Sequence, residues 1–452
     1  MGTEKVAQFI TDTSYEKIPK EAINSSKQAI LDCLGVMLAG CDDPGCKILN
    51  EYIKEEGGVA EAGIIGGNLK TTASQAAWAN GNIAHSLDYD DYAAAFVGHP
   101  TVALLPAILS ISEKLHLSGR EILLSYVIGF ETGAAVSPLC GLQSYMVGWH
   151  TTSTIGAIGA VAAAAKLLNL TVDQTRMALG IASSLSNGLK ENFGTMTKPL
   201  HAGNAAKNGV VAAILAKKGF TANENILEGE QGFCRVFAGG AEIDANEIGK
   251  SLGEEYTVAK DLSMKPYPSC AGTHATIDCG LYLNKNYDIN PEEIEDIEIR
   301  INPGLAKSTI HSNPQTGLEG KFSNEYCVAT ALVEGEVGLK HFTDEKVNQP
   351  VIKRLVERAK YNNTEETALG SEVLVTLRDG NVLSHKVNSP KGFVDNPVTM
   401  SDTEIKYTDC ASLIMPKGEV DRSLQLITNL EELKDVVTLM DILTYRGKSP
   451  AS

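Results

Sequence analysis

The sequence predicts a mainly α protein, in which a large all-helical domain is built from the N- and C-terminal parts of the chain and a smaller α+β domain is inserted between them. Two observations support this fold class. Segments with helical spacing of apolar residues, many of them rich in Ala and Gly, run through residues 1–265, whereas strand patterns occur within residues 266–395. Helical periodicity returns in residues 396–452, which we expect to rejoin the first domain.

The first part of the chain contains a succession of expected helices. Apolar residues repeat at helical spacing over residues 23–40, and Ala-rich segments follow at 71–84, 153–168 and 203–217. The last of these ends in Lys217-Lys218-Gly219, a cation followed by Gly, which is typical of a helix C-terminus. Small residues on helix faces let the axes approach closely, so the pattern favours a large helical bundle.

The inserted domain shows strand periodicity. Ile297, Ile299 and Ile301 alternate with polar residues, and the segments 371–377 and 382–387 flank Asp379-Gly380, a hairpin signal. Residues 326–332 and 351–359 read as helices between these strands. A Pro- and Gly-containing linker with a capping motif then leads to a last helix at 424–443, which we expect to pack on the first domain.

Composition excludes several classes of function. The 452 residues carry 39 basic and 56 acidic side chains, a net charge of −17, and no basic run, so we expect no nucleic-acid partner. The nine cysteines are scattered without a C-x-x-C pair, which argues against a disulfide framework and a zinc ribbon. We see no signal peptide and no apolar run of membrane-spanning length, since residues 155–165 stop at Lys166. The sequence thus predicts a cytoplasmic protein without a membrane partner.

Common cofactor and nucleophile motifs are missing from the sequence. There is no G-x-G-x-x-G or Walker A loop, no H-E-x-x-H, no EF-hand loop and no G-x-S-x-G. We therefore expect no cofactor and no conventional metal site, with chemistry carried by ordinary side chains or by a metal bound in another pattern.

The first of four polar segments is HSLDYDDYAAAFVGHP, residues 85–100, which places two histidines beside three carboxylates and two tyrosines. Acid–base chemistry is one interpretation. Metal-dependent hydrolysis is another, because Asp88, Asp90 and Asp91, with His99, could hold a hard cation.

Two further segments place His or Lys at expected helix N-termini. In GWHTTST, His150 precedes a helix whose dipole favours the neutral imidazole. In TKPLHAGN, Pro199 is expected to start a helix. Lys198 would then lie at the N-terminus of this helix, and His201 on one of its faces. A lysine has the wrong sign for a helix N-terminus, so an anion bound by both the lysine and the helix is the better explanation.

The fourth segment is KPYPSCAGTH, with Lys265, and with Cys270 in a loop that feeds the next helix. Cys270 with His274 leaves a cysteine hydrolase open, and a non-catalytic helical binding protein is a further alternative. Each of the four segments combines His or Lys with a loop-to-helix junction. Together they could form one pocket, in which cations hold carboxylates and His, Tyr, Asp and Cys move protons.

Seven motifs follow one another along nearly the whole chain: HSLDYDD, HP, GWHTTST, KPLHAGNAAKNG, KPYPSCAGTH, FSNEYCVATALVEGEV and KGFVDNPVTMSDTEI. In this order, they resemble the MmgE/PrpD family. That family includes 2-methylcitrate dehydratase, cis-aconitate decarboxylase and iminodisuccinate epimerase. The resemblance implies a helical domain formed from both chain ends, an α+β lid domain and a homodimer. It also implies cofactor-independent chemistry on small polycarboxylates, in a cleft between the two domains.

Position by position, the resemblance implies that the cleft is lined by Asp88, Tyr92, His99, His150, Lys198, Lys265, Cys270 and Tyr326. Tyr145 and His201 are further substrate-binding candidates. This chain has Tyr92 where decarboxylase members have Thr, and Cys270 where they have His.

The family reactions pass through a carbanion or enolate-like species beside a carboxylate, which the site must stabilise. We expect Lys198, Lys265 and His99 to clamp substrate carboxylates. His150 is the first choice for general base and Asp88 its partner, while Tyr92 and Tyr326 could donate to a leaving oxygen. Cys270 would be a second proton carrier.

The predicted function is a cofactor-independent lyase on a small di- or tricarboxylate. The expected reaction is dehydration of a 2-methylcitrate- or citrate-like hydroxy acid. A cis-aconitate type of decarboxylase and an iminodisuccinate type of epimerase are the alternatives.

Overall fold

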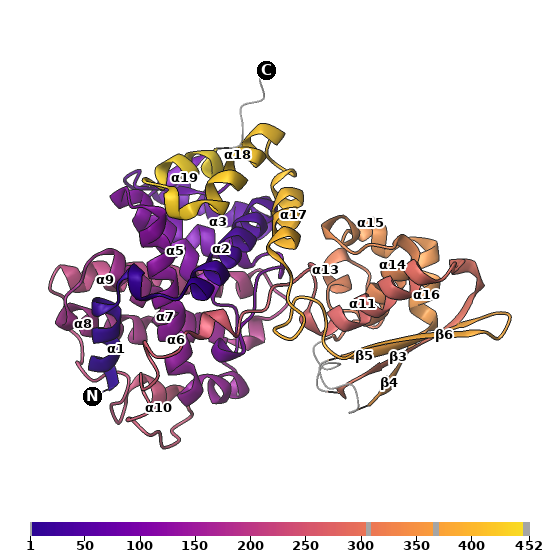
Figure 1. Cartoon of the computed structure of the whole chain (residues 1–452), viewed down its shortest axis with the longest axis horizontal. Helices are drawn as coiled ribbons and strands as arrows, with labels where there is room; N and C mark the ends of the chain where they lie inside the picture. Colours follow the sequence, from indigo (N-terminus) through magenta and orange to yellow (C-terminus); the bar gives the residue numbers. More distant parts are fainter. Residues whose placement is uncertain (1, 304–308, 365–369, 446–452) are drawn as a thin grey trace. The chain divides into compact units, whose positions relative to one another are not determined.

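The computed structural model describes residues 2–303, 309–364 and 370–445 and divides the chain into two compact units (Figure 1). Unit 1 comprises residues 1–264 and 399–452, and unit 2 comprises residues 265–398. The predicted fold class is confirmed: helices dominate, and strands form two small sheets.

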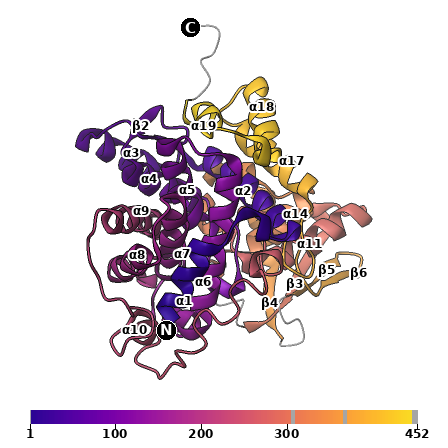
Figure 2. The same cartoon turned by 60° about the vertical axis from the view of Figure 1, so that its left-hand side comes forward.

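Unit 1 is a helical body with one short hairpin (Figure 2). Its helices and strands are α1 (Gly2–Asp12), α2 (Lys20–Gly40), α3 (Pro44–Glu56), β1 (Ala62–Ile64), β2 (Leu69–Thr71), α4 (Ala73–His85), α5 (Thr101–Leu115), α6 (Gly119–Val147), α7 (Thr151–Leu167), α8 (Val172–Leu185), α9 (Thr197–Lys217), α10 (Phe233–Phe237), α17 (Met400–Ala411), α18 (Lys417–Thr428) and α19 (Val437–Thr444).

The helices α4, α5, α7 and α9 pack together as a connected group in unit 1 (Figure 2). Glycines set their spacing. A Cβ atom on Gly81 of α4 would lie 2.7 Å from the Cα of Gly203 in α9, and a Cβ on Gly203 would lie 2.3 Å from the Trp78 carbonyl oxygen. The two backbones therefore touch where α4 crosses α9, as the small-residue pattern of the sequence predicted.

The C-terminal segment returns to unit 1, where α17 packs along α2 (Figure 1). The single helix expected at residues 424–443 is wrong. The chain forms α18 and α19, separated by the short 3₁₀ helix Leu430–Glu432. The Leu433 carbonyl accepts from the Gly119 amide at the start of α6, at 2.8 Å, so the interruption itself makes a tertiary contact.

Helix α6 was not expected from periodicity, because it is apolar around most of its circumference and contains Pro138. It is the one helix in the described part of the chain that is long and apolar enough to cross a membrane, contrary to the expectation that no segment is. However, 78% of its most apolar window is buried inside the protein. A core helix of a helical domain has this composition.

Unit 2 is an α+β unit with a four-stranded sheet in the order β4-β3-β5-β6. Its elements are α11 (Ala271–Asn286), β3 (Ile294–Ile301), α13 (Gly317–Gly320), α14 (Asn324–Glu334), α15 (Asp344–Val347), α16 (Pro350–Arg358), β4 (Ala359–Asn363), β5 (Ser371–Leu377) and β6 (Val382–Val387). The hairpin β5–β6 has its predicted bounds. Helices α11 and α16 pack on the sheet, and α14 packs on both of them (Figure 1).

Candidate active site

In unit 1, the C-terminal end of α4 meets the N-terminal ends of α5, α7 and α9, and the polar segments of the sequence lie at these ends. The loop between α4 and α5 is tied to the start of α7. The Thr152 hydroxyl accepts from the His99 amide at 3.1 Å, and the Thr151 hydroxyl donates to the Val97 carbonyl. These threonines therefore position His99.

One carboxylate oxygen joins two imidazoles at this place. Oδ2 of Asp90 lies 2.9 Å from Nδ1 of His85 and 3.0 Å from Nδ1 of His99. Asp90 and His85 are fully buried, whereas the His99 side chain is 15% exposed. His99 Nδ1 also lies 2.6 Å from the Asp91 carbonyl oxygen.

A second pair of imidazoles lies beside the first. The Nδ1 atoms of His150 and His201 are 3.1 Å apart, so one ring donates and the other accepts. The His150 ring stacks on His85, with ring centroids 5.7 Å apart, and Phe193 contacts its other side edge-on at 4.8 Å. Four histidines from α4, the following loop, the start of α7 and the first turn of α9 thus form one cluster.

Burial keeps most of this cluster neutral. It lowers the pKa of His85 to about 4, against the raising effect of Asp90, and it lowers the pKa of His150 well below its usual range. Burial also lowers the pKa of His201, to which the positive charge of Lys198 adds. By contrast, the pKa of Asp90 is held well below its usual range: burial alone would raise it, but the contacts with His85 and His99 outweigh burial. At neutral pH the cluster therefore presents three neutral imidazoles, those of His85, His150 and His201, beside one carboxylate.

Lys198 supplies a positive charge at the same place. Its Nζ lies 2.5 Å from Oδ1 of Asp88, and both side chains are 13% exposed. Asp88 has φ of 54°, a left-handed conformation that is uncommon for a non-glycine residue. The turn at Asp88 directs its carboxylate toward the first turn of α9, which begins at Thr197, two residues before the expected start at Pro199.

The four ligands expected for a metal-dependent hydrolase are not brought together. Asp88 pairs with Lys198, and Asp91 is fully bonded elsewhere, since it accepts from the Thr101 hydroxyl and amide. Burial raises the pKa of Asp91 well above its usual range. In the described part of the chain, a metal-binding geometry arises instead at His85, Asp90 and His99, whose ligand atoms lie within 4.8 Å of one another.

Tyr92 borders the cluster, and Tyr145 acts electrostatically on Tyr92. The Tyr92 ring lies edge-on to His99 at 6.0 Å, and burial, followed by the negative charge of Asp261, raises the pKa of its phenol. The Tyr145 ring, at the end of α6, carries Lys190 over its face, with Nζ 3.4 Å from the centroid. Tyr92 is therefore a protonated phenol beside an imidazole.

The remaining candidates belong to unit 2. Lys265 is buried, and Cys270 is partly exposed as the N-cap residue of α11, with its amide bonded to the Lys321 carbonyl at 2.9 Å. His274 is buried and its Nε2 lies 3.2 Å from the Ser269 carbonyl oxygen, so that nitrogen does not serve Cys270. The roles of Lys265 and Cys270 stay predictions.

Tyr326 lies inside the core of unit 2. It is 1% exposed, and its hydroxyl donates to the His341 carbonyl. A phenol whose proton is held in this way is a structural group of unit 2, so we do not retain Tyr326 as a donor to the substrate.

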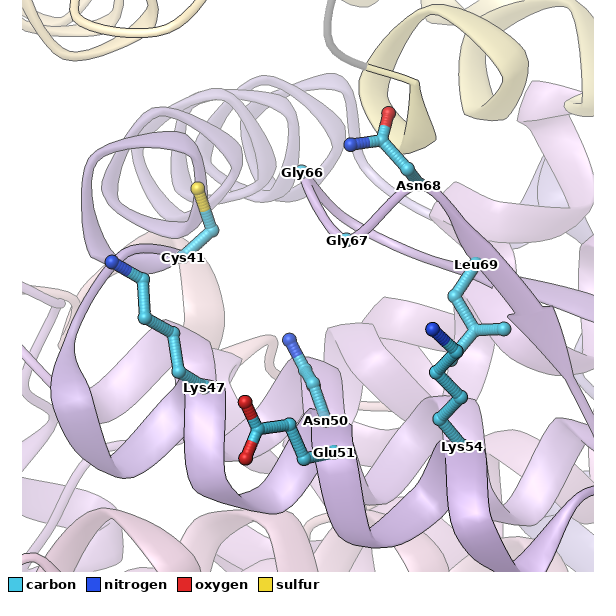
Figure 3. Close-up of a pocket in the computed structure, with 9 residues that line it drawn as sticks. All are labelled: Cys41, Lys47, Asn50, Glu51, Lys54, Gly66, Gly67, Asn68 and Leu69. Atoms are coloured by element: carbon cyan, nitrogen blue, oxygen red, sulfur yellow. The ribbon is translucent and has the colours of Figure 1, made fainter.

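A separate pocket in unit 1, of about 430 Å³, lies between α3 and the β1–β2 turn (Figure 3). None of the predicted site residues lines it. Lys47 and Lys54 border it from α3, Asn50 projects into it, and Gly66 and Gly67 form the opposite wall.

The sequence interpretation assigned no role to His85 and considered Asp90 only as a metal ligand. Both stand in the HSLDYDD motif, and their spacing of five residues was the available signal. Their contact depends on the left-handed turn at Asp88, which the sequence did not reveal.

Comparison with known proteins agrees with these observations. Residues 4–246 match the MmgE/PrpD N-terminal domain and residues 267–432 match the MmgE/PrpD C-terminal domain. Cis-aconitate decarboxylase from Mus musculus is 28% identical over 98% of this chain and 93% of its own length, and that from Homo sapiens is 28% identical over 99% and 95%. A mitochondrial 2-methylcitrate dehydratase from Yarrowia lipolytica is 24% identical over 86% and 80%. With both domains matched in order and with relatives that are enzymes, the chain belongs to the MmgE/PrpD family.

Proposed function

We propose that the protein is a cofactor-independent lyase that acts on a small di- or tricarboxylate through an enolate-like intermediate, and that its reaction is dehydration of a 2-methylcitrate- or citrate-like hydroxy acid. The observation that carries this proposal is the cluster of neutral imidazoles beside Lys198. A neutral imidazole accepts a proton, and a lysine ammonium stabilises the negative charge that develops on the substrate.

The reaction balances with the groups of unit 1. A neutral imidazole, from His150 or His99, takes the proton from a carbon next to a carboxylate. The electron pair moves toward that carboxylate, where Lys198 stabilises the charge, and then forms the double bond as the adjacent carbon–oxygen bond breaks. The phenol of Tyr92 gives its proton to the departing hydroxyl, which leaves as water.

Proton abstraction distinguishes this reaction from decarboxylation. A decarboxylase must deliver a proton to carbon after carbon dioxide leaves, which calls for a protonated acid. Because the pKa values of His85, His150 and His201 are all lowered, these rings carry no spare proton at neutral pH. The imidazoles therefore favour proton abstraction over proton delivery, which supports dehydration.

Decarboxylation of cis-aconitate is the second candidate. It is supported by the cis-aconitate decarboxylases that match 98% and 99% of the chain. A proton for the substrate carbon would then have to come from Tyr92 or from another donor.

The experiment is incubation of the purified protein with 2-methylcitrate, citrate, cis-aconitate and iminodisuccinate in deuterated water, followed by proton NMR. Dehydration predicts solvent deuterium at the ionised carbon of a hydroxy acid and formation of an alkene. The alkene would appear as a new vinyl signal from citrate, or as collapse of the methyl doublet to a singlet from 2-methylcitrate. Loss of carbon dioxide from cis-aconitate would favour the second candidate. No turnover and no deuterium uptake with any of the four would contradict the proposal. The homodimer and the cytoplasmic location stay predictions.

A further inference from the structure

The bonding of Asp90 fixes which nitrogen of each neighbouring imidazole carries hydrogen. An ionised carboxylate oxygen only accepts hydrogen bonds, so an imidazole nitrogen at 2.9–3.0 Å from it must donate. For His99, the second atom near Nδ1 is the Asp91 carbonyl oxygen, which is also an acceptor. In their neutral forms, His85 and His99 therefore both carry the hydrogen on Nδ1, and the lone pair is on Nε2.

The two rings differ in what their Nε2 atoms can reach. His85 is fully buried, and its Nε2 lacks a hydrogen-bond partner among the described residues. His99 is 15% exposed, and its ring centroid lies 4.8 Å from that of His85. His85 thus fills the space between Asp90, His99 and His150, whereas His99 offers its Nε2 to the outside.

We propose that Asp90 is a positioning residue. It holds His85 with Nδ1 protonated, and together with the Asp91 carbonyl it holds His99 in the same tautomer, which leaves His99 Nε2 as a proton acceptor. This inference rests on the proposed lyase function and changes one role within it. A neutral His99 whose Nδ1–H is bound to Asp90 has no hydrogen on Nε2, so it cannot clamp a substrate carboxylate there, as the sequence suggested.

The same contacts also indicate which of His99 and His150 is the better proton acceptor. When His99 takes a proton, the positive charge forms next to the Asp90 carboxylate, which stabilises it. When His150 takes a proton, its Nδ1 faces another imidazole, and the surrounding positive charges oppose it. The geometry therefore assigns the proton to His99.

A metal ion at His85, Asp90 and His99 is the competing explanation for the same three residues. Coordination through the His99 nitrogen nearest Asp90 would need a lone pair on Nδ1. That nitrogen lies 2.6 Å from a backbone carbonyl oxygen, whose lone pairs would face the lone pair of the ring. Hydrogen bonding satisfies every one of these contacts, so we favour it.

The first test is a neutron structure of hydrogen–deuterium-exchanged crystals at pH 7, which needs no substrate. Deuterium is expected on Nδ1 of His85 and His99. Nε2 of both rings should carry no deuterium, and Asp90 should be ionised. In Asp90→Asn, His99 should keep Nδ1–D through the Asp91 carbonyl, whereas His85 should become a mixture of tautomers. Deuterium on His99 Nε2 alone, or a metal between the rings, would overturn the proposal.

The second test uses the kinetics of Asp90→Asn with whichever carboxylate is turned over. Because Asp90 stabilises the charged imidazole without touching substrate, kcat should fall by roughly 10²–10⁴-fold while KM changes by less than about threefold. The matched control is Glu113→Gln, which alters another buried carboxylate, one that accepts from the Gly63 amide and pairs with Lys70. It should lower Tm but leave kcat within about tenfold.

The outcomes separate the two proposals. An unchanged kcat in Asp90→Asn, or an equal loss in both variants, would overturn the positioning role even if the lyase activity is found. If none of the four carboxylates is turned over, the lyase proposal fails, and the neutron structures still decide the tautomers.

Discussion

The Nζ atom of Lys198 lies 2.5 Å from Oδ1 of Asp88, so the cation proposed to bind the substrate is paired with a carboxylate of the protein itself. A substrate carboxylate must take over part of this bond. Lys198→Gln keeps a hydrogen-bond donor but removes the charge, and a charge-assisted hydrogen bond contributes roughly 1.5–3 kcal/mol. We expect KM to rise by about 10–100-fold, as measured by steady-state kinetics.

Asp88→Asn is the matched change on the other side of the pair. It releases the lysine charge, so anion binding should tighten, and isothermal titration with an unreactive dicarboxylate should show a lower Kd. Weaker binding in Asp88→Asn than in Lys198→Gln would show that Lys198 does not bind the substrate.

His99→Gln and His150→Gln distinguish the two candidate bases. Removal of the proton acceptor should lower kcat by roughly 10²–10⁴-fold, and we expect this loss for His99→Gln. His150→Gln should have the smaller effect on kcat. The control is His116→Gln, because His116 lies on the surface, 68% exposed beside Asp435, and should be without effect. A KM effect alone in His99→Gln, with loss of kcat in His150→Gln, would restore the roles expected from the sequence.

Glu131 makes stability depend on pH. It is 3% exposed on α6, and burial raises its pKa to about 7, although it accepts from the amides of Thr257 and Val258. The folded state thus favours the protonated form. The contribution of Glu131 to the free energy of unfolding is fully present below about pH 4.5. It is lost as pH rises through 7, which lowers the free energy of unfolding by about 3 kcal/mol. Urea unfolding at pH 4.5–8 should show this slope, and Glu131→Gln should flatten it. Parallel slopes in the two proteins would contradict the role of Glu131.

Removal of metal ions should leave the activity unchanged. The reason is that the candidate metal ligands already have other partners. His99 Nδ1 donates to oxygen atoms, Asp88 forms an ion pair with Lys198, and Asp91 accepts a hydrogen bond from Thr101. Rates should be measured after dialysis against a chelator, with metal content determined by mass spectrometry. A loss of activity that one divalent metal restores would support the metal-dependent alternative.

Gly203→Ala should destabilise the protein, since its Cβ would meet the Trp78 carbonyl oxygen of α4 at 2.3 Å. Overpacking of this kind costs about 1–3 kcal/mol, to be read from urea unfolding. The control is Gly418→Ala in α18, where a Cβ would meet no atom within 4 Å, so stability should stay the same or rise slightly. Equal stability in the two variants would show that α4 and α9 can move apart.

Much of the fold could be predicted because local patterns decide it. The Asp379-Gly380 turn between two alternating segments defined the β5–β6 hairpin. Apolar spacing located α2 and α7 to within three residues at each end. Helix α6 was missed because a helix that is apolar on nearly all sides has no periodic signal. The break between α18 and α19 depends on a contact with the start of α6, which is not local.

The candidate site was predicted in part for a similar reason. His or Lys at a loop-to-helix junction is visible in the sequence, and Lys198, His150 and His99 were found in this way. Which partner each side chain takes is set by tertiary packing. The Asp90 contact to two rings, and the burial of Tyr326 in the core of unit 2, could not be read from spacing.

The backbone contact between Gly81 and Gly203 limits how this site can diversify. With no side chain between α4 and α9, the distance from the end of one helix to the beginning of the other has no adjustable spacer. New substrate preferences in proteins built this way would therefore arise through the loops at residues 86–100 and 186–196, while the helix crossing stays the same.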